Sequence, residues 1–567
     1  MGAISTLAGW VLPSASGVDW VRRRRFGTRA VLTIDIEELS GRKSSADVLF
    51  RLADVIEMAG RDPLLAVIHL RLFDTRGGFG SLQCLRAAIK RARESGRAVV
   101  AELVSAGNAD LYVASACDRV FCTPSVESNA WGIRARMTYF GDALRSLGVG
   151  VDVVAIGDYK SLAEPATRSH PSVAARDAMQ SVISDLHLQW VEGLAASRGL
   201  TAANVEEFAQ IGPISGEELA ERGVVDAVAY SDEIEAWLEQ ELGGEVRWFG
   251  LKSYRRWRRW RAMRRRSQTA NGRVAVVHCS GPIMMSAAGR RGSLIAAADL
   301  VALADQLREQ DTVRGVVLAI SSGGGSALAS ELIARSIERL GAEKPVVAVL
   351  GDTAASGGYY FPVLAHEIYA QPGTLTGSIG VVGGKLLAGP ALAKLGVHVT
   401  TISGGLGDDP FDPSRPFSSD ERHRIERSMS RFYDRFLDRV ATGRGKTREV
   451  VEPWAGGRVW TGRQARELGM IDGFGTTADA FRRACGLADL EPWPARRVDC
   501  VLYRRPLWQR LARKSSVEAS PLWQMLSATP IWRAGAALKA SVGAELALLT
   551  ERPGRPLALL PWRLDID

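Results

Sequence analysis

Ser356 is the residue whose surroundings most strongly indicate nucleophilic chemistry. It stands in Ala354-Ala-Ser-Gly-Gly358, between a run typical of a buried strand and a helical pattern. Two glycines directly after a serine let a backbone N–H face a reacting carbonyl without obstruction by side chains. Because a serine hydroxyl is a poor nucleophile at neutral pH, it needs a base.

Lys160, in Gly157-Asp-Tyr-Lys-Ser-Leu-Ala-Glu-Pro165, is the candidate base. A lysine serves as a base only when its amine is largely neutral, so its pKa must fall from ~10.4 toward ~7–8 through desolvation or neighbouring dipoles. Histidine is the usual alternative. His366, ten residues after Ser356, is expected about three turns along the following helix and facing away, so a Ser-His-Asp triad is the weaker hypothesis.

An internal repeat relates two halves of the chain. Val104–Tyr112 aligns with Asp352–Tyr360, and the register is constant, since 360 − 112 = 248 and 372 − 124 = 248. Asn108 occupies the place of Ser356 in the first half, while the counterpart of the Lys160 segment, after Thr401, has no lysine. Such complementary loss predicts one composite site between the two halves.

The elements around these residues are predicted to form two similar α/β domains. In each half a buried-strand run leads to a Gly-rich turn, a helical pattern and another β-rich run, which is a βαβ unit. Such units predict largely parallel sheets covered by helices. The expected organisation is a basic N-terminal segment (1–29), a lysine-bearing domain (30–246), a basic aromatic linker (247–271), a serine-bearing domain (272–490) and a C-terminal tail that contacts a membrane surface (491–567).

Four motifs in this order carry a family resemblance: Gly157-x-Tyr-Lys-Ser-x-x-Glu-Pro165, Ser322-Gly-Gly-Gly-Ser326-x4-Glu331, Ala354-Ala-Ser-Gly-Gly-Tyr-Tyr360 and Leu375-Thr-Gly-Ser-Ile-Gly380. They resemble the signal peptide peptidase A family, also called protease IV, in its long double-domain form. The resemblance implies a fold related to Clp protease and crotonase in each half. It assigns the nucleophile to Ser356, the base to Lys160, a serine that bonds the lysine amine to Ser378, and the oxyanion hole to the N–H groups of Gly357 and Gly324.

The implied activity is that of an ATP-independent serine endopeptidase with a Ser/Lys dyad, acting through an acyl-enzyme. The implied substrates are short apolar peptides such as remnant signal peptides, and the implied assembly is a homo-oligomer without cofactor or metal. One departure is Gly323, where the family usually has a proline that rigidifies the turn. Two alternatives remain: a crotonase-like enzyme acting on acyl-CoA thioesters, and a non-catalytic membrane-associated scaffold derived from such a peptidase.

Composition limits the partners and the location. The net charge is +9, and one Lys and eight Arg lie between Lys252 and Arg266, interleaved with aromatic residues. This pattern is typical of a segment on an anionic membrane surface, although a solvated linker face or a nucleic-acid contact has the same composition. No nucleic-acid-reading motif is present. A transmembrane helix needs ~18 or more consecutive apolar residues, and neither such a run nor a cleaved signal peptide is evident, so peripheral association with the inner membrane is predicted.

Overall fold

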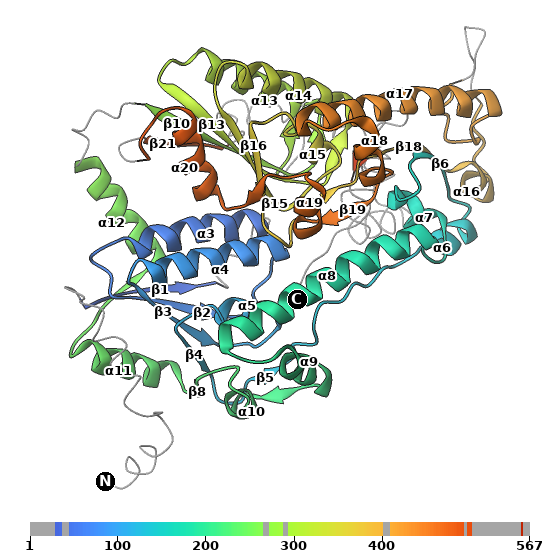
Figure 1. The fold of residues 1–567 in the computed structure, drawn as a ribbon. Coiled ribbons are helices and arrows are strands. Elements are labelled where there is room, and N and C mark those ends of the chain that lie inside the picture. The colour runs from blue at the N-terminus through green and yellow to red at the C-terminus, as the bar shows by residue number, and fades with distance from the viewer. Residues whose placement is uncertain are drawn as a thin grey trace.

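The computed structural model describes residues 29–36, 45–264, 272–286, 293–400, 409–492, 496–501 and 557–559. The basic N-terminal segment, the end of the linker and most of the C-terminal tail, all singled out from the sequence, lie outside the described residues. The described chain forms two α/β domains, as predicted from the internal repeat (Figure 1).

The first domain is built on a six-stranded parallel sheet in the order β8-β4-β3-β2-β1-β9. Its central strand β3 (Ala98–Leu103) is buried at every residue, which explains why its sequence does not alternate and why every residue except Glu102 is apolar. The other strands are β1 (Ala30–Asp35), β2 (Val67–Leu72), β4 (Arg119–Cys122), β8 (Ala227–Val228) and β9 (Arg247–Gly250).

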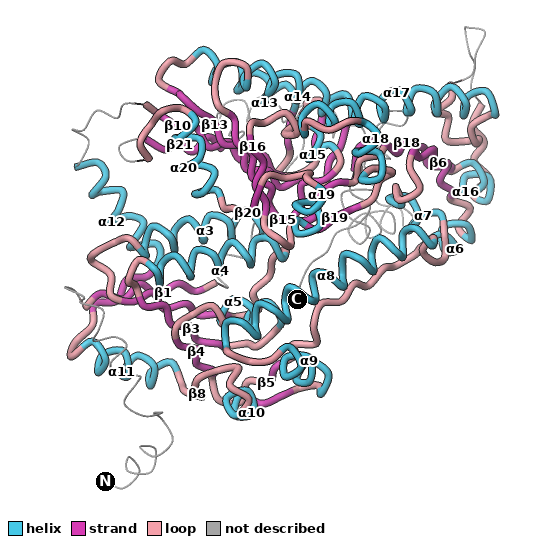
Figure 2. The backbone as a smooth tube through the Cα atoms, in the orientation of Figure 1, coloured by secondary structure: helices cyan, strands magenta, loops and turns pink. Residues whose placement is uncertain are grey.

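Helices and a two-stranded ribbon complete the first domain (Figure 2). The helices are α3 (Ser45–Gly60), α4 (Phe79–Glu94), α5 (Asn108–Ala114), α6 (Gly141–Ser146), α7 (Glu164–Thr167), α8 (Val173–Arg198), α9 (Ala202–Ile211), α10 (Gly216–Glu221), α11 (Ser231–Leu242) and α12 (Leu251–Arg264). The ribbon pairs β5 (Glu127–Ser128) with β7 (Ile214–Ser215). Helices α3 and α4 lie between the first sheet and the second domain (Figure 1).

The second domain repeats this architecture around the order β19-β17-β15-β13-β10-β21; β16 also pairs with β15, and β20 pairs with β16. Its strands are β10 (Arg273–Ser280), β13 (Val313–Ser322), β15 (Val346–Ala355), β16 (Glu367–Ala370), β17 (Leu375–Gly377), β19 (Val459–Thr461), β20 (Gly473–Phe474) and β21 (Arg496–Val501). Its helices are α13 (Ala297–Glu309), α14 (Ala327–Gly341), α15 (Gly357–Tyr360), α16 (Gly389–Lys394), α17 (Ser419–Arg444), α18 (Arg448–Val451), α19 (Gly462–Leu468) and α20 (Thr477–Leu487).

Equivalent elements of the two domains are separated by nearly the same number of residues as the repeated sequence motifs. Helix α4 begins at Phe79 and α14 at Ala327, so that 327 − 79 = 248. The long helices α8 and α17 both have 26 residues and begin 419 − 173 = 246 apart. The two domains are therefore copies of one fold that differ by a two-residue gap before the long helix.

A third sheet joins the two domains. The first domain sends out β6 (Gly150–Ile156), which pairs antiparallel with β18 (Val381–Leu387) of the second. The sheet continues in the order β12-β11-β14-β22-β18-β6, with β12 (Ile295–Ala296), β11 (Ile283–Met284), β14 (Gly324–Ser326) and β22 (Leu557–Leu559). Both domains thus contribute strands to the region around the Gly-rich turn.

The segment expected to link the domains is partly folded onto the first one. Strand β9 pairs with β1, and α12 follows it with Tyr254 buried and hydrogen-bonded through its hydroxyl to Asp62 Oδ2 at 3.1 Å. Lys252 and Arg256, on the same helix, are exposed. Within the described ranges, no helix combines the length and the apolar character that crossing a membrane requires.

Asp352 ties the second domain to the first. This residue lies on β15, and its carboxylate accepts hydrogen bonds from the backbone N–H groups of Gly78, at 3.2 Å, and Ser81 at the start of α4. A helix N-terminus has unpaired N–H groups and a positive end of the helix dipole, so a carboxylate there is stabilising. The second domain thus supplies the N-terminal cap of a helix in the first.

We expect Asp352→Ala to lower the unfolding midpoint in denaturant, because loss of such a cap costs about 1–2 kcal/mol. The matched control is Asp177→Ala, which removes an exposed aspartate from α8. Chemical denaturation followed by circular dichroism measures both variants. Equal midpoints for the two variants would contradict a stabilising role of this contact between domains.

Candidate active site

Ser356 lies at the turn between β15 and α15 in a constrained conformation. Its φ is +54° and its ψ −119°, and its side chain is fully buried. Its N–H donates to Gly377 O at 2.8 Å, which fixes the turn against β17. Five described non-glycine residues have a positive φ, and Ser356 and Ser378 are two of them. Because such conformations cost about 1–3 kcal/mol, strain concentrates at these two serines.

Lys160 reaches this turn from the other domain. It follows β6 and precedes a short 3-10 turn, Ser161–Ala163. Its backbone lies against Gly457, where an added Cβ would come within 2.8 Å of Lys160 Cα and Cβ. The preceding residue, Tyr159, donates its N–H to Gly456 O at 2.9 Å. The second domain therefore holds the backbone that carries the lysine.

The Lys160 amine makes three hydrogen-bonded contacts in a buried position. Its Nζ lies 2.9 Å from Ser356 Oγ, 2.8 Å from Ser378 Oγ and 3.0 Å from Ser378 O. The lysine side chain is only 4% exposed, and both serines are fully buried. The three residues that the sequence brings together as nucleophile, base and second serine are thus adjacent.

Burial lowers the pKa of Lys160 well below its ordinary value, because desolvation penalises the charged ammonium. A neutral amine has two N–H donors and one lone pair. The two N–H groups suit Ser378 O and Ser378 Oγ, which leaves the lone pair for the hydroxyl proton of Ser356. The three contacts therefore match the protonation state that a base requires.

The two glycines assigned to the oxyanion hole lie beside each other. A Cβ added to Gly357 would be 3.3 Å from Gly324 Cα. Gly324, with φ +107°, donates its N–H to Ser322 Oγ at 3.1 Å. The Gly324 N–H therefore already has a hydrogen-bond acceptor, Ser322 Oγ, in its own turn. To serve as an oxyanion-hole donor, it must give up this acceptor for the carbonyl oxygen of a substrate.

Strand β22 lies between β14 and β18 in the third sheet. Strand β22 pairs antiparallel with both neighbours: Leu559 is opposite Gly324, and Leu557 is opposite Ser326 and Val382. The chain in β22 therefore runs from the side of Ser326 toward Gly324, which lies beside Gly357 in space. An extended peptide can add to these two strands through its backbone, in the manner of β-augmentation.

The first domain has no serine hydroxyl at the position equivalent to Ser356. Asn108 lies at the start of α5, where its side chain donates to Gly132 O at 3.2 Å and accepts from Gly132 N at 3.0 Å. The alternative base, His366, accepts at Nδ1 the N–H of Val346 at 3.2 Å, whereas Lys160 occupies the place beside Ser356. The hypothesis of a histidine base is therefore less well supported than that of a lysine base.

Sequence reasoning missed the glycines that support the lysine. Gly456 and Gly457 both have positive φ and contact the Lys160 segment. The only signal available was the Gly-Gly pair itself, which marks a turn without indicating what packs against it. A second omission is the buried Tyr360 hydroxyl, which bonds Glu331 of the Gly-rich motif.

Comparison with known proteins agrees with the resemblance inferred from the motifs. The model of peptidase family S49 matches residues 91–245 and 338–491, one stretch in each domain. The chloroplastic serine protease SPPA of Arabidopsis thaliana is 30% identical over 82% of this chain and 69% of that protein. Protease 4 of Salmonella typhi is 29% identical over 78% of this chain and 73% of its own. Protease 4 of Haemophilus influenzae is 27% identical over 80% and 75%.

The chain therefore belongs to peptidase family S49, in the form that carries two copies of the family domain. The predictions of this family and of two α/β domains are confirmed. Membership supports a peptidase activity, while the roles of individual residues rest on the geometry described above.

We expect Gly457→Ala to lower peptidase activity on the order of 100-fold, because displacing a catalytic group by ~1 Å has effects of that size. The matched control is Gly445→Ala at the end of α17, where φ is also positive (+58°) but an added Cβ has no neighbour within 4 Å. Hydrolysis of an apolar fluorogenic peptide compares the two. Equal activities would show that the contact with Lys160 is unimportant.

Proposed function

We propose that this protein is an ATP-independent serine endopeptidase with a Ser356/Lys160 dyad. The observation that carries the proposal is the buried amine of Lys160 within hydrogen-bond distance of both Ser356 Oγ and Ser378 Oγ. A crotonase-like acyl-CoA enzyme needs no such pair. A non-catalytic scaffold gives no reason to keep a desolvated lysine beside a strained serine.

In the proposed reaction, Lys160 accepts the hydroxyl proton of Ser356 as Oγ attacks the peptide carbonyl carbon. Negative charge develops on the carbonyl oxygen, which faces the N–H groups of Gly357 and Gly324; donors placed in this way contribute ~3–4 kcal/mol each. The ammonium of Lys160 then protonates the leaving amine, and an acyl-enzyme remains. Lys160 next takes a proton from water, the hydroxide attacks the acyl carbon, and Ser356 is released with its proton restored.

Ser378 orients the base rather than reacting. Its hydroxyl and carbonyl oxygens both accept from Nζ, so rotation of the amine away from Ser356 breaks two hydrogen bonds. A positive φ of +51° and an N–H bond to Arg458 O at 2.7 Å hold Ser378 in place. We assign it a positioning role.

The proposed substrates are short, apolar, extended peptides, such as the remnants left by signal-peptide cleavage. Support comes from the place between β14 and β18, where residues 557–559, Leu-Ala-Leu, pair as strand β22. Backbone pairing on two sides tolerates many sequences, which suits a degradative enzyme. Access to such peptides is consistent with contact between the basic surface of α12 and an anionic membrane.

The proposed dyad predicts a specific pH dependence. Below the lowered pKa of Lys160 the amine is protonated and cannot accept the Ser356 proton, so kcat/KM rises with pH through that pKa and then levels off. We expect the midpoint well below 10.5, the ordinary value for lysine. Peptide hydrolysis across pH 6–10 measures the profile.

Ser356→Ala and Lys160→Met are the accompanying variants, and both should lose at least about 1000-fold in kcat, the size of loss seen when members of a catalytic unit are removed. Thermal unfolding controls for misfolding. Because the wild type must bury an amine that is protonated when unfolded, Lys160→Met is expected to be no less stable at pH 7. A wild type that is inert toward peptides and acylating inhibitors would exclude the proposed activity.

Because β22 pairs with both β14 and β18, we expect it to compete with a substrate that binds there as a strand. A chain ending at residue 556 lacks β22, and we expect its KM for an apolar peptide to fall severalfold with kcat unchanged. A chain ending at residue 559 retains β22 and is the matched control. Steady-state kinetics of the two truncated chains give the comparison. Identical KM values would show that β22 does not compete.

A further inference from the structure

We infer that Tyr433, on α17, positions the Lys160 segment (residues 157–160) opposite Ser356. This role rests on the proposed function and deepens it, because Lys160 is the base of the proposed dyad. Tyr433 acts through the backbone of Gly456, so it is a positioning residue rather than a catalytic one.

Two hydrogen bonds connect the Tyr433 hydroxyl to the Lys160 segment. Gly456 donates its N–H to the hydroxyl at 3.2 Å, and the carbonyl of Gly456 accepts the N–H of Tyr159 at 2.9 Å. A Cβ added to Gly157 would come within 2.4 Å of the carbonyl carbon of Gly456, so the two backbones are in close contact. The position of Gly456 therefore determines the position of the chain that leads into Lys160.

The turn formed by Gly456 and Gly457 needs such an anchor. The two residues have φ of +69° and +86°, and a glycine loses more conformational freedom than any other residue when it is held in one conformation. Gly457 donates its N–H to Ile379 O at 2.8 Å, and Gly456 donates its own to Tyr433. The tyrosine hydroxyl is therefore one of the two acceptors that fix the N–H groups of this turn.

The residue before Tyr433 contacts the helix that follows the nucleophile. The ring of Phe432 stacks on that of Tyr360, with centroids 5.4 Å apart and planes at 21°, and Phe436 meets Tyr360 edge-on at 4.8 Å. Tyr360 is the last residue of α15, the short helix that begins directly after Ser356. Consecutive residues of α17 thus hold the helix after the nucleophile and the turn beneath the base, and α17 sets the spacing between them.

The Tyr433 hydroxyl stays neutral at the pH of a peptidase assay. Burial raises the pKa of Tyr433, and Glu452 and Asp434 raise it further, whereas the hydrogen bond with Gly456 and the charge of Arg448 lower it. A neutral hydroxyl keeps a lone pair for the Gly456 N–H. Replacement by phenylalanine therefore removes one hydrogen-bond acceptor without changing the charge around Lys160.

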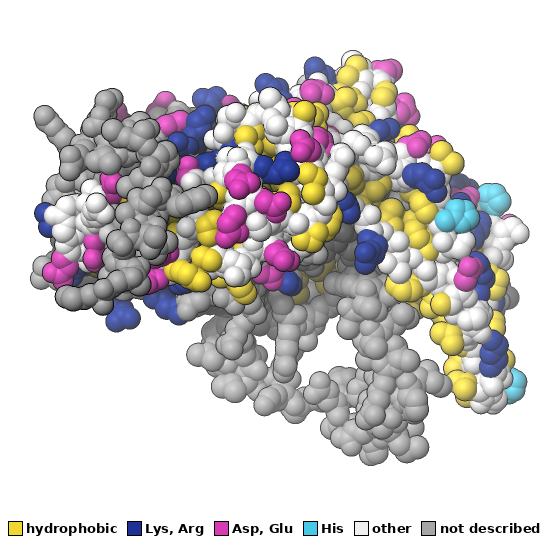
Figure 3. Space-filling view, turned by 90° about the horizontal axis from the view of Figure 1, so that it is seen from below, with side chains coloured by type: hydrophobic (Ala, Val, Ile, Leu, Met, Phe, Trp, Pro, Cys, Tyr) yellow, Lys and Arg dark blue, Asp and Glu magenta, His cyan; other side chains and the backbone are white. Residues whose placement is uncertain are grey.

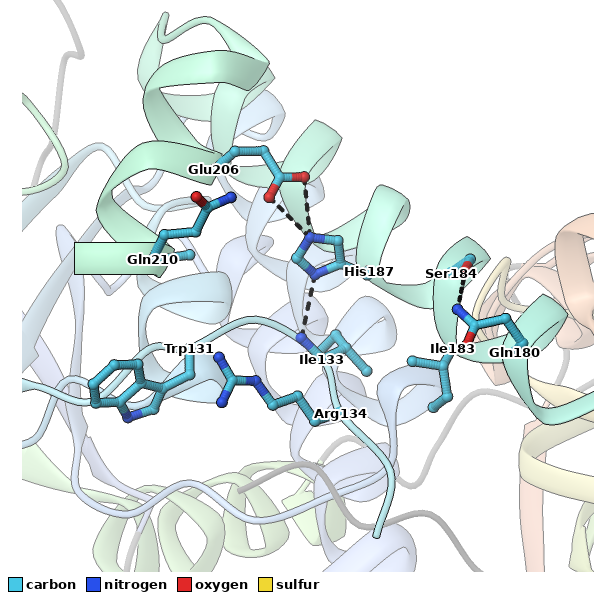
Figure 4. Close-up of a pocket in the computed structure, with 10 residues that line it drawn as sticks. Trp131, Ile133, Arg134, Gln180, Ile183, Ser184, His187, Glu206 and Gln210 are labelled. Carbon is cyan, nitrogen blue, oxygen red and sulfur yellow. Dashed lines mark hydrogen bonds and ion pairs between the residues drawn. The ribbon is translucent and has the colours of Figure 1, made fainter. Parts of the chain in front are cut away.

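The first domain shows the same helix position without a tyrosine. With the offset of 246 set by the two long helices, His187 of α8 corresponds to Tyr433. Its Nε2 lies 3.0 Å from Glu206 Oε1, and its Nδ1 is 3.3 Å from the N–H nitrogen of Ile133 (Figure 4). These contacts remain within the first domain, whereas those of Tyr433 lead to the Lys160 segment.

The residues equivalent to those that hold the Lys160 segment line an open pocket in the first domain. Gln210 corresponds to Gly456, and together with His187 it lines a pocket of about 290 Å³. Gln210 and Trp131 lie across this pocket from each other (Figure 4). The tyrosine and the lysine segment therefore occur together in the second domain, and the described part of the first domain has neither at the equivalent places.

Tyr433→Phe tests the role, because it removes the acceptor of the Gly456 N–H and keeps the ring. We expect kcat for an apolar fluorogenic peptide to fall on the order of 10-fold, part of the loss of about 100-fold that a displacement of ~1 Å causes. KM should be unchanged, because the strands β14 and β18, on which the peptide is proposed to pair, remain in place.

The pH profile separates positioning from a merely structural role. A loosened Lys160 segment lets water reach the amine, so the pKa of Lys160 rises toward the ordinary value of lysine. The rising limb of kcat/KM should therefore move to higher pH in Tyr433→Phe. A variant that only contains less folded enzyme lowers the whole profile and leaves its midpoint where it was.

Two control variants accompany this one. Tyr369→Phe removes another half-buried tyrosine hydroxyl of the second domain, which donates to Glu367 at 2.6 Å. Glu217→Gln removes an exposed charge from α10, around which acidic side chains gather in the view from below (Figure 3). Both controls should keep the kcat and the midpoint of the wild type.

Peptide hydrolysis across pH 6–10 compares the four proteins, with thermal unfolding as a check on folding. A midpoint in Tyr433→Phe equal to that of an active wild type would overturn the positioning role, whatever the change in kcat, and would leave the proposed dyad standing. An equal shift in either control would overturn it as well. A wild type that hydrolyses no peptide would instead contradict the proposed activity itself.

Discussion

The arrangement of the two domains depends on excluding water from the amine of Lys160. A charged ammonium in a site as closed as that of Lys160 is strongly unfavourable, and no carboxylate is among the hydrogen-bond partners of its Nζ that the structure describes. The amine is stable there only as a neutral group with three oxygen partners. Closing the site requires surface from two domains, and Lys160 lies shortly after β6, the strand of the first domain that pairs with β18 of the second.

The backbone around the site is as specialised as the side chains. Ser356 and Ser378 both adopt positive φ, and glycines at positions 377 and 457 remove the Cβ atoms that would collide with their surroundings. The strain is sustained because β15, β17 and β19 form a continuous ladder behind the two serines. The site is thus preorganised by regular structure rather than by a flexible loop.

Much of the fold and of the candidate site was predictable, because short stretches of sequence encode it. Strand runs, the Gly-rich turn and the constant offset of 248 indicated two copies of an α/β domain, and complementary loss at Asn108 and at the lysine segment indicated a composite site. Contacts made between distant segments were not predictable. Nothing near Gly457 indicates that Lys160 will lie on it, and the bond from Gly324 N to Ser322 Oγ depends on a turn conformation that three successive glycines leave open.

The division of Ser356 and Lys160 between two domains has a consequence for the chain while it is being synthesised. The domain made first contains Lys160 but an asparagine, Asn108, in place of the serine, and the domain made second contains Ser356 but receives Lys160 from the first. A nascent or half-folded chain therefore lacks the assembled pair of Ser356 and Lys160. The pair is complete only after β6 has paired with β18, so the proposed peptidase is expected to stay inactive until both domains have been made and folded.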